Sequence, residues 1–188
     1  MQLFTYDILE LVSMSMKSHF GSFNTGTGAI GTTITLAGLG FAPRAILFWW
    51  SGRTEATDTV GRANSQNGFG VAVTSTDRRA ITISGIDAQG TSDNQRAHSN
   101  VACILSVSNT PAIDGAMDLQ SINPDGFTLI VDDAFPTSLR VHYLALGGDS
   151  LEAAASGQFQ EPLATGDQDT TTVGFEPDCV LFFSIAHT

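Results

Sequence analysis

The sequence predicts an all-β protein, an antiparallel two-sheet sandwich that resembles a jelly roll and carries a partial C-terminal repeat. Short apolar runs alternate with turn residues from Gly21 onward. Charged residues make up only 14% of the chain, and Gly, Ser, Thr, Asn and Asp, which favour turns, take their place. No alternation of helical and strand patterns supports an α/β fold. About eight strands in roughly 130 residues suffice for two packed sheets.

The expected strands follow one another at short intervals. One of them alternates cleanly, with Leu139, Val141, Tyr143 and Ala145 on the same face. The run at residues 45–50 is apolar throughout and indicates a central strand. The turn Asn-Pro-Asp-Gly, whose Gly tolerates a positive φ, precedes the seventh expected strand. The eight predicted strands lie near residues 32–37, 44–50, 68–75, 79–85, 100–108, 115–120, 126–132 and 138–146.

An internal repeat defines the domain organisation. Residues 40–49 read Gly-Phe-Ala-Pro-Arg-Ala-Ile-Leu-Phe-Trp, and residues 174–183 read Gly-Phe-Glu-Pro-Asp-Cys-Val-Leu-Phe-Phe. Upstream of each block stands a Gly-x-Phe, at Gly21 and again at Gly157. The predicted organisation is an N-terminal arm or short helix (1–20), a sandwich (21–148), a linker (149–156) and the first strands of a second copy (157–188).

Three explanations of this second copy remain open. The chain is a piece of a longer tandem protein, or its last strands complete the first sandwich, or they are donated to a neighbouring subunit. Each explanation leaves an unpaired β edge, whose exposed backbone groups can pair with a strand of another molecule. We therefore expect a homo-oligomer.

Charge and hydropathy narrow the choice of partners. Eight Lys and Arg stand against 19 Asp and Glu, for a net charge of −11. Binding to nucleic acid needs a clustered basic surface, and an anionic membrane would repel the chain, so neither is an expected partner. No signal peptide is recognised, because Asp7 and Glu10 interrupt the apolar N-terminal stretch. No stretch reaches the roughly 18 apolar residues of a membrane span. We expect a soluble protein.

Candidate catalytic and metal sites are weak, and we predict no enzyme, cofactor or metal. Gly-Asp-Ser-Leu around Ser150 matches the signature of a serine esterase family, but it follows the last expected strand of a β domain rather than the first strand of an α/β fold. The histidines lack the spacing of metal ligands. The two cysteines are expected to be small buried side chains. The acid pairs read as solvated loop carboxylates. The histidines are His19, His98, His142 and His187, the cysteines are Cys103 and Cys179, and the acid pairs are Asp132 with Asp133 and Asp167 with Asp169.

Binding residues are expected around one strand and two loops. Trp49 and Trp50 are adjacent on a predicted strand, so that one enters the core and the other needs cover from a second layer, a subunit or a sugar ring. The polar stretch 54–67 is the longest candidate loop, and the loop 92–100 is the second. The candidate binding residues are Trp49, Trp50, Arg53, Asn64, Gln66, Arg96 and His98.

Three short motifs carry a family resemblance. They are the block at residues 40–49, Asp-Gly-Phe-Thr-Leu at 125–129 and Tyr-Leu-Ala-Leu-Gly-Gly at 143–148. Together they resemble β-rich structural proteins of tailed phages and prophages. The resemblance implies a non-catalytic fibre, spike or decoration component at a virion or extracellular surface. It implies self-association or contact with other virion proteins, and contact with host glycans. The alternative is a carbohydrate- or receptor-binding sandwich module.

Overall fold

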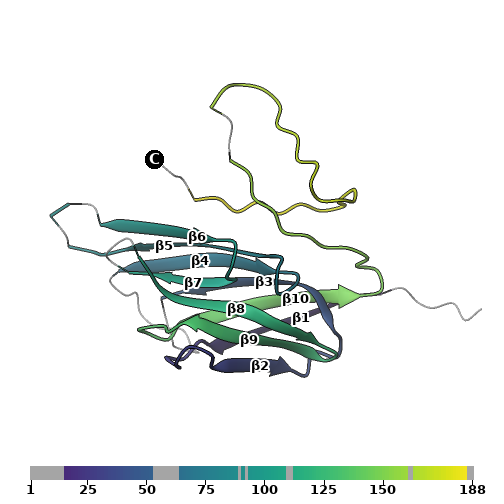
Figure 1. The fold of residues 1–188 in the computed structure, drawn as a ribbon, viewed down its shortest axis with the longest axis horizontal. Helices are drawn as coiled ribbons and strands as arrows, with labels where there is room; N and C mark the ends of the chain where they lie inside the picture. Colours follow the sequence, from purple (N-terminus) through teal and green to yellow (C-terminus); the bar gives the residue numbers. More distant parts are fainter. Residues whose placement is uncertain are drawn as a thin grey trace, which may run out of the picture.

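The protein folds into two antiparallel sheets packed face to face (Figure 1). The computed structural model describes residues 15–52, 64–88, 90–91, 93–108, 112–160 and 163–185. The predicted all-β sandwich is confirmed. The six-stranded sheet has the order β1 (Met16–Asn24), β10 (Arg140–Gly148), β3 (Pro43–Ser51), β4 (Ser65–Ala72), β5 (Arg78–Gly85) and β6 (Asn94–Ser99). The four-stranded sheet has the order β2 (Thr33–Ala37), β9 (Gly126–Asp133), β8 (Ile113–Asn123) and β7 (Ile104–Val107).

The strand order combines pairing between the two ends of the sandwich domain with two runs of consecutive antiparallel strands. The first strand pairs with the last, β1 with β10, and the second pairs with the second to last, β2 with β9. This concentric pairing is what gives a jelly roll its wrapped form. Between these pairs, β3 to β6 and β7 to β9 run as neighbouring hairpins. Strand β3 thereby lies between β10 and β4, as its continuous apolar sequence predicts.

The core is built from the inward residues of both sheets. Phe48 of β3 and Phe127 of β9 are both fully buried, and their rings meet edge to face with centroids 6.0 Å apart. Tyr143 of β10 meets Phe127 in the same geometry at 5.3 Å. Such pairs add about 0.5–1.5 kcal/mol to the energy of burial alone. The aromatic rings therefore join the two sheets at the centre of the sandwich.

Two strands of the six-stranded sheet were not predicted from the sequence. Strand β1 includes Met16 and Phe20, which the sequence pattern places in the arm, and residues 1–14 lie outside the described part of the chain. Strand β6 occupies most of the stretch 92–100, so the prediction of a binding loop there is wrong. Both strands lie at the edges of the sheet. An edge strand faces water and tolerates polar residues, so its sequence lacks the apolar run that reveals a central strand.

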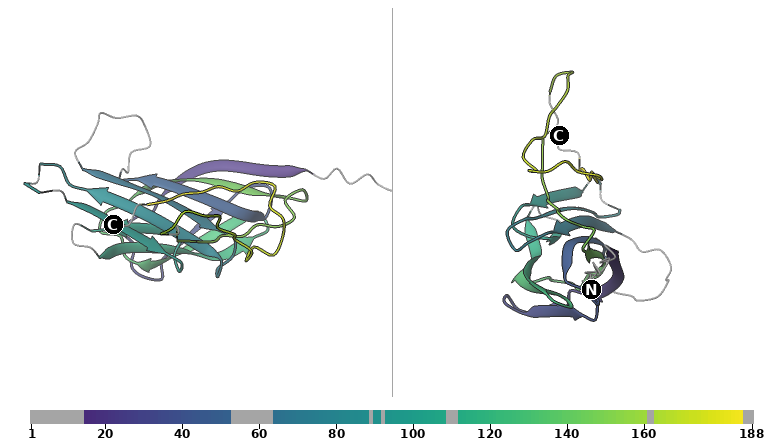
Figure 2. Two further views of the ribbon diagram at one scale, coloured as in Figure 1. Left: turned by 90° about the horizontal axis from the view of Figure 1, so that it is seen from above. Right: turned by 90° about the vertical axis from the view of Figure 1, so that its right-hand side faces the viewer.

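The C-terminal segment, residues 149–185, leaves the sandwich after β10 and contains no strand among its described residues. Figure 2 shows it as irregular loops that project from the sandwich. Cys179 of this segment is exposed, which corrects the expectation of two buried thiols, whereas Cys103 is buried as predicted. Neither cysteine forms a disulfide. The described part of the chain also holds no helix of the length and apolarity that crossing a membrane requires.

Candidate functional site

The outer face of the six-stranded sheet, the face turned away from β7 to β9, carries large apolar and aromatic side chains among polar ones. Strand pairing aligns one row of outward residues over neighbouring strands: Ser22, His142, Trp49, Phe69, Ile81 and His98. A second row runs through Phe20, Leu144, Leu47 and Val71. The outer face of a solvated sheet is usually polar, alternating with an apolar inner face. Apolar residues on both faces therefore indicate that this sheet has a second contact surface.

Three rings form a cluster on this face, which we call the ring cluster: Phe20 of β1, His142 of β10 and Trp49 of β3. The three ring centroids form a triangle, in which His142 lies 6.0 Å from Trp49 and 6.2 Å from Phe20 and its plane is tilted by only 17° and 18° from theirs. Phe20 and Trp49 are 5.6 Å apart. The Phe20 side chain is 62% exposed. The ring cluster thus presents a broad, rigid aromatic surface to the outside.

Charge is divided unevenly between the two sheets. The strands of the six-stranded sheet contain no Asp or Glu, whereas those of the four-stranded sheet contain no Lys or Arg. In a chain of net charge −11, this makes the six-stranded sheet a basic region on an acidic protein. The cations of the six-stranded sheet are Lys17, Arg44, Arg78, Arg79, Arg96 and Arg140, and the acids of the four-stranded sheet are Asp114, Asp118, Asp132 and Asp133.

The C-terminal segment covers one part of the outer face. The Phe183 ring stacks on Phe69 with centroids 4.6 Å apart. Ser184 and Ile185 line a small depression together with Phe69, Ile81 and Ile83. The ring cluster does not take part in this contact, and Phe20 remains largely exposed. The face is therefore covered at β4 and β5 and open at β1.

The predicted binding residues divide between this face and the sandwich interior. Trp49, Arg96 and His98 lie on the outer face, Trp49 near its centre and the other two on the edge strand β6. Trp50 is buried over Gly68 of β4, where a Cβ atom would lie 2.1 Å from the indole ring. Glycine at 68 thus makes room for the tryptophan.

The remaining predicted residues hold the fold. Gln66 points inward, and its Nε2 donates a hydrogen bond of 2.8 Å to Ser106 Oγ of β7 in the other sheet. The Asp87 backbone N–H donates to Asn64 Oδ1 at 3.0 Å, so that Asn64 ties the start of β4 to the turn after β5. Both contacts join parts of the sandwich to each other. Arg53 lies outside the described residues.

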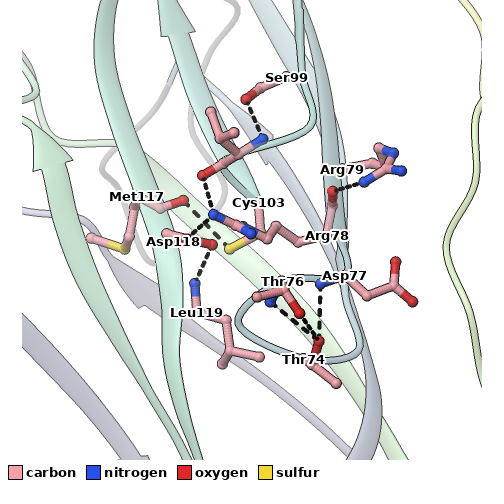
Figure 3. Close-up of polar contacts among 11 residues, drawn as sticks. Thr74, Thr76, Asp77, Arg78, Arg79, Ser99, Cys103, Met117, Asp118 and Leu119 are labelled. Atoms are coloured by element: carbon pink, nitrogen blue, oxygen red, sulfur yellow. Dashed lines mark hydrogen bonds and ion pairs between the residues drawn. The ribbon is translucent and has the colours of Figure 1, made fainter.

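A polar cluster joins the sheets at another place in the sandwich (Figure 3). Arg78 of β5 forms an ion pair of 2.8 Å with Asp118 of β8, and it donates a second bond to the Val101 carbonyl at 3.1 Å. Burial raises the pKa of the Asp118 carboxyl, and the Leu119 N–H and Arg78 offset part of that rise. Burial also raises the pKa of the Cys103 thiol well above its usual range. A thiol of raised pKa is a weak nucleophile, so the cluster serves structure.

The other candidate catalytic residues lie apart from one another. Ser150 is in the turn after β10, closed by a bond of 3.3 Å from Leu151 N to the Gly148 carbonyl. His19 stacks on Tyr143 at 5.9 Å on the inner side of β1. His187 lies outside the described residues. No group of His, Cys, Asp and Glu with the arrangement of a metal site occurs in the described ranges.

Sequence reasoning missed Phe20 and Phe69 as members of the outer face, and it did not name His142 as a binding residue. The sequence contains part of the information, because each of these residues has apolar or aromatic neighbours in its own strand. They become one surface only through the register of β1, β10, β3 and β4. Comparison of the chain with protein-family models, with curated proteins and with solved structures found no match. The function is therefore argued from this surface.

Proposed function

We propose that the protein is a non-catalytic structural component that assembles with copies of itself through the outer face of its six-stranded sheet. The observation that carries the proposal is the ring cluster on the β1 side of the outer face, where Phe20 is largely exposed. Aromatic side chains are the residues that most often dominate the energy of protein contacts. A large exposed apolar patch on a soluble protein commonly marks such a contact.

The setting that we propose is a virion or extracellular surface, as part of a fibre, spike or decoration. The resemblance of residues 40–49, 125–129 and 143–148 to phage structural proteins supports this setting. A two-sheet sandwich also suits the role, because a rigid scaffold presents a flat sheet face without the cost of ordering loops.

The test is sedimentation velocity over a concentration series. We expect the unaltered protein to associate, and Phe20→Asp to weaken the association at least about tenfold, because a charge would be buried in an apolar contact. The matched control is Ile30→Asp, at a side chain that is 68% exposed in the connection between β1 and β2. A monomer at every concentration, or an equal effect of Ile30→Asp, would contradict the proposal.

A second candidate, carbohydrate binding, is favoured by the near-parallel rings of the cluster. Flat aromatic surfaces on a sheet stack against sugar rings, and arginines such as Arg140 at the edge of the face supply hydrogen-bond donors. A glycan array decides between the candidates. A signal that disappears in Trp49→Ala and persists in Ile30→Asp supports this second candidate. No signal on any glycan removes it.

A further inference from the structure

Residues 157–185 keep a backbone feature of the first strands of the sandwich, although none of the described residues in this range lies in a strand. Gly40, in the turn before β3, has φ +77°, and Gly174, its counterpart in the repeat, has φ +79°. This left-handed conformation favours glycine. At Gly40 the turn is held by a hydrogen bond from its N–H to Asp125 Oδ1. The two copies thus share the conformation of this glycine as well as a sequence.

The large apolar residues of the segment occupy positions that are buried in the first copy. Phe48 is 0% exposed and its counterpart Phe182 is 72% exposed; Phe23 is 8% exposed and Phe159 is 54%. Val180 is likewise open to solvent where Ile46 is fully buried. A loop in water gains no stability from large apolar side chains at these positions. The residues are those of a core, and the described chain does not bury them.

A glycine identifies the kind of strand that is lacking. Gly21 of β1 pairs with Tyr143 of β10, and a Cβ atom at Gly21 would lie 2.5 Å from the tyrosine hydroxyl oxygen. Glycine at 21 therefore makes room for that ring. Its counterpart Gly157 has nothing within 4 Å of its Cβ position. The repeat thus has a glycine at this position although no ring lies over it in the described structure. We infer that the missing partner is a strand like β10, with an aromatic residue opposite Gly157.

The sheet of the same chain does not supply this strand. Both edges of β10 are already paired, to β1 and to β3. The contact of the segment with the outer face is made by its last residues, through Phe183 on Phe69 and through Ser184 and Ile185. Phe159 and Phe182 stay exposed and contact each other instead, with centroids 5.9 Å apart. The partner strands must come from outside residues 15–148.

We propose that residues 157–185 are the opening strands of a second sandwich of the same fold, and that they pair with strands equivalent to β4–β10 of a further copy of this repeat. The segment at 177–183 takes the place of β3, between a β10-like and a β4-like strand. Phe182 then meets the equivalent of Phe127 in the opposite sheet, as Phe48 does in the first copy.

The first experiment extends the full chain after Ile185 with a second copy of residues 52–148. We expect residues 163–185 to become protected from a protease by about 100-fold or more, because cleavage follows the population of the open form. The matched variant Phe182→Asp in the extended chain should abolish the protection. Cleavage as fast as in the unextended chain would overturn the proposal.

The second experiment tests, within the first sandwich of the full chain, whether the sequence of the repeat can form strand β3. Residues 40–49 are replaced by the sequence of residues 174–183, which changes Ala42→Glu, Arg44→Asp, Ala45→Cys, Ile46→Val and Trp49→Phe. The control carries the same ten residues in shuffled order. Cooperative urea unfolding of the exchange variant, and its loss in the control, supports the proposal. Loss of cooperative unfolding in both, or its retention in both, overturns it.

Discussion

The opening strands of the sandwich and the C-terminal segment have related sequences and different structures. Strand β3 is paired on both sides, and the side chains of Ile46 and Phe48 are fully buried. The matching residues Val180 and Phe182 lie in an irregular loop without a strand partner, and each side chain is more than half exposed. An isolated strand gains no ladder hydrogen bonds and buries little surface, so it does not offset the entropy of ordering its backbone. Neighbouring strands, and not the apolar run itself, make β3 a strand.

The largest expected effect comes from truncating the two matched phenylalanines. We expect Phe48→Ala to lower the free energy of unfolding by about 4 kcal/mol, because it removes a fully buried ring and leaves a cavity. Phe182→Ala should change it by no more than about 0.5 kcal/mol, since the ring is mostly in water. Urea unfolding measures both. A loss of similar size in Phe182→Ala would mean that the segment belongs to the first core.

The next effect concerns the ion pair that joins the two sheets and has no equivalent in the opening strands of the repeat. Arg78→Met leaves the Asp118 carboxylate without its partner in a mostly buried site, which should cost about 3 kcal/mol at neutral pH. The double variant Arg78→Met/Asp118→Leu should recover most of this loss, because no charge is then left unpaired. A double variant no more stable than Arg78→Met would show that the charge of Asp118 is not the cause.

The cost of Arg78→Met should also depend on pH in a defined direction. The pKa of Asp118 in the folded protein lies above its ordinary value of 3.8, so the folded state binds a proton more readily than the unfolded state. The contribution of Asp118 to stability therefore falls as pH rises through this window. Removal of Arg78 raises the pKa of Asp118 in the folded protein further, because Arg78 lowers it. The pH range between the unfolded and the folded pKa then becomes wider. The deficit of Arg78→Met should be largest at neutral pH and shrink towards pH 4, as urea unfolding at several pH values will show.

The smallest effect compares the two glycines of left-handed conformation. Gly40→Ala forces an alanine to φ +77° without a clash of its Cβ, which should cost about 1 kcal/mol of stability. Gly174→Ala creates the same local strain in a segment that has no strand among its described residues, so we expect its urea midpoint to be unchanged. Equal shifts in the two variants would contradict the separation of the two regions.

Much of the fold was predictable because central strands carry a strong pattern. The apolar run of β3 and the alternation of β10 predict strands with one face or both faces buried. Edge strand β6 was missed because Asn94, Arg96 and His98 read as loop residues and nothing local reveals that β5 lies beside them. Of the candidate site, Trp49 was predicted. Its partners Phe20 and His142 were not, since they come from strands distant in sequence.

The sequence by itself determined the all-β class, the alternation that places Trp49 and Trp50 on opposite faces, and the repeat at the C-terminal end. These follow from local periodicity and composition, which each strand carries alone. Only the tertiary structure decided which strands share a sheet, and hence that the cations and acids are divided between the two sheets and that three rings from distant strands form one surface. The physical reason is that strand pairing is set by long-range hydrogen bonds and packing, for which a strand's own residues specify a face but not a neighbour.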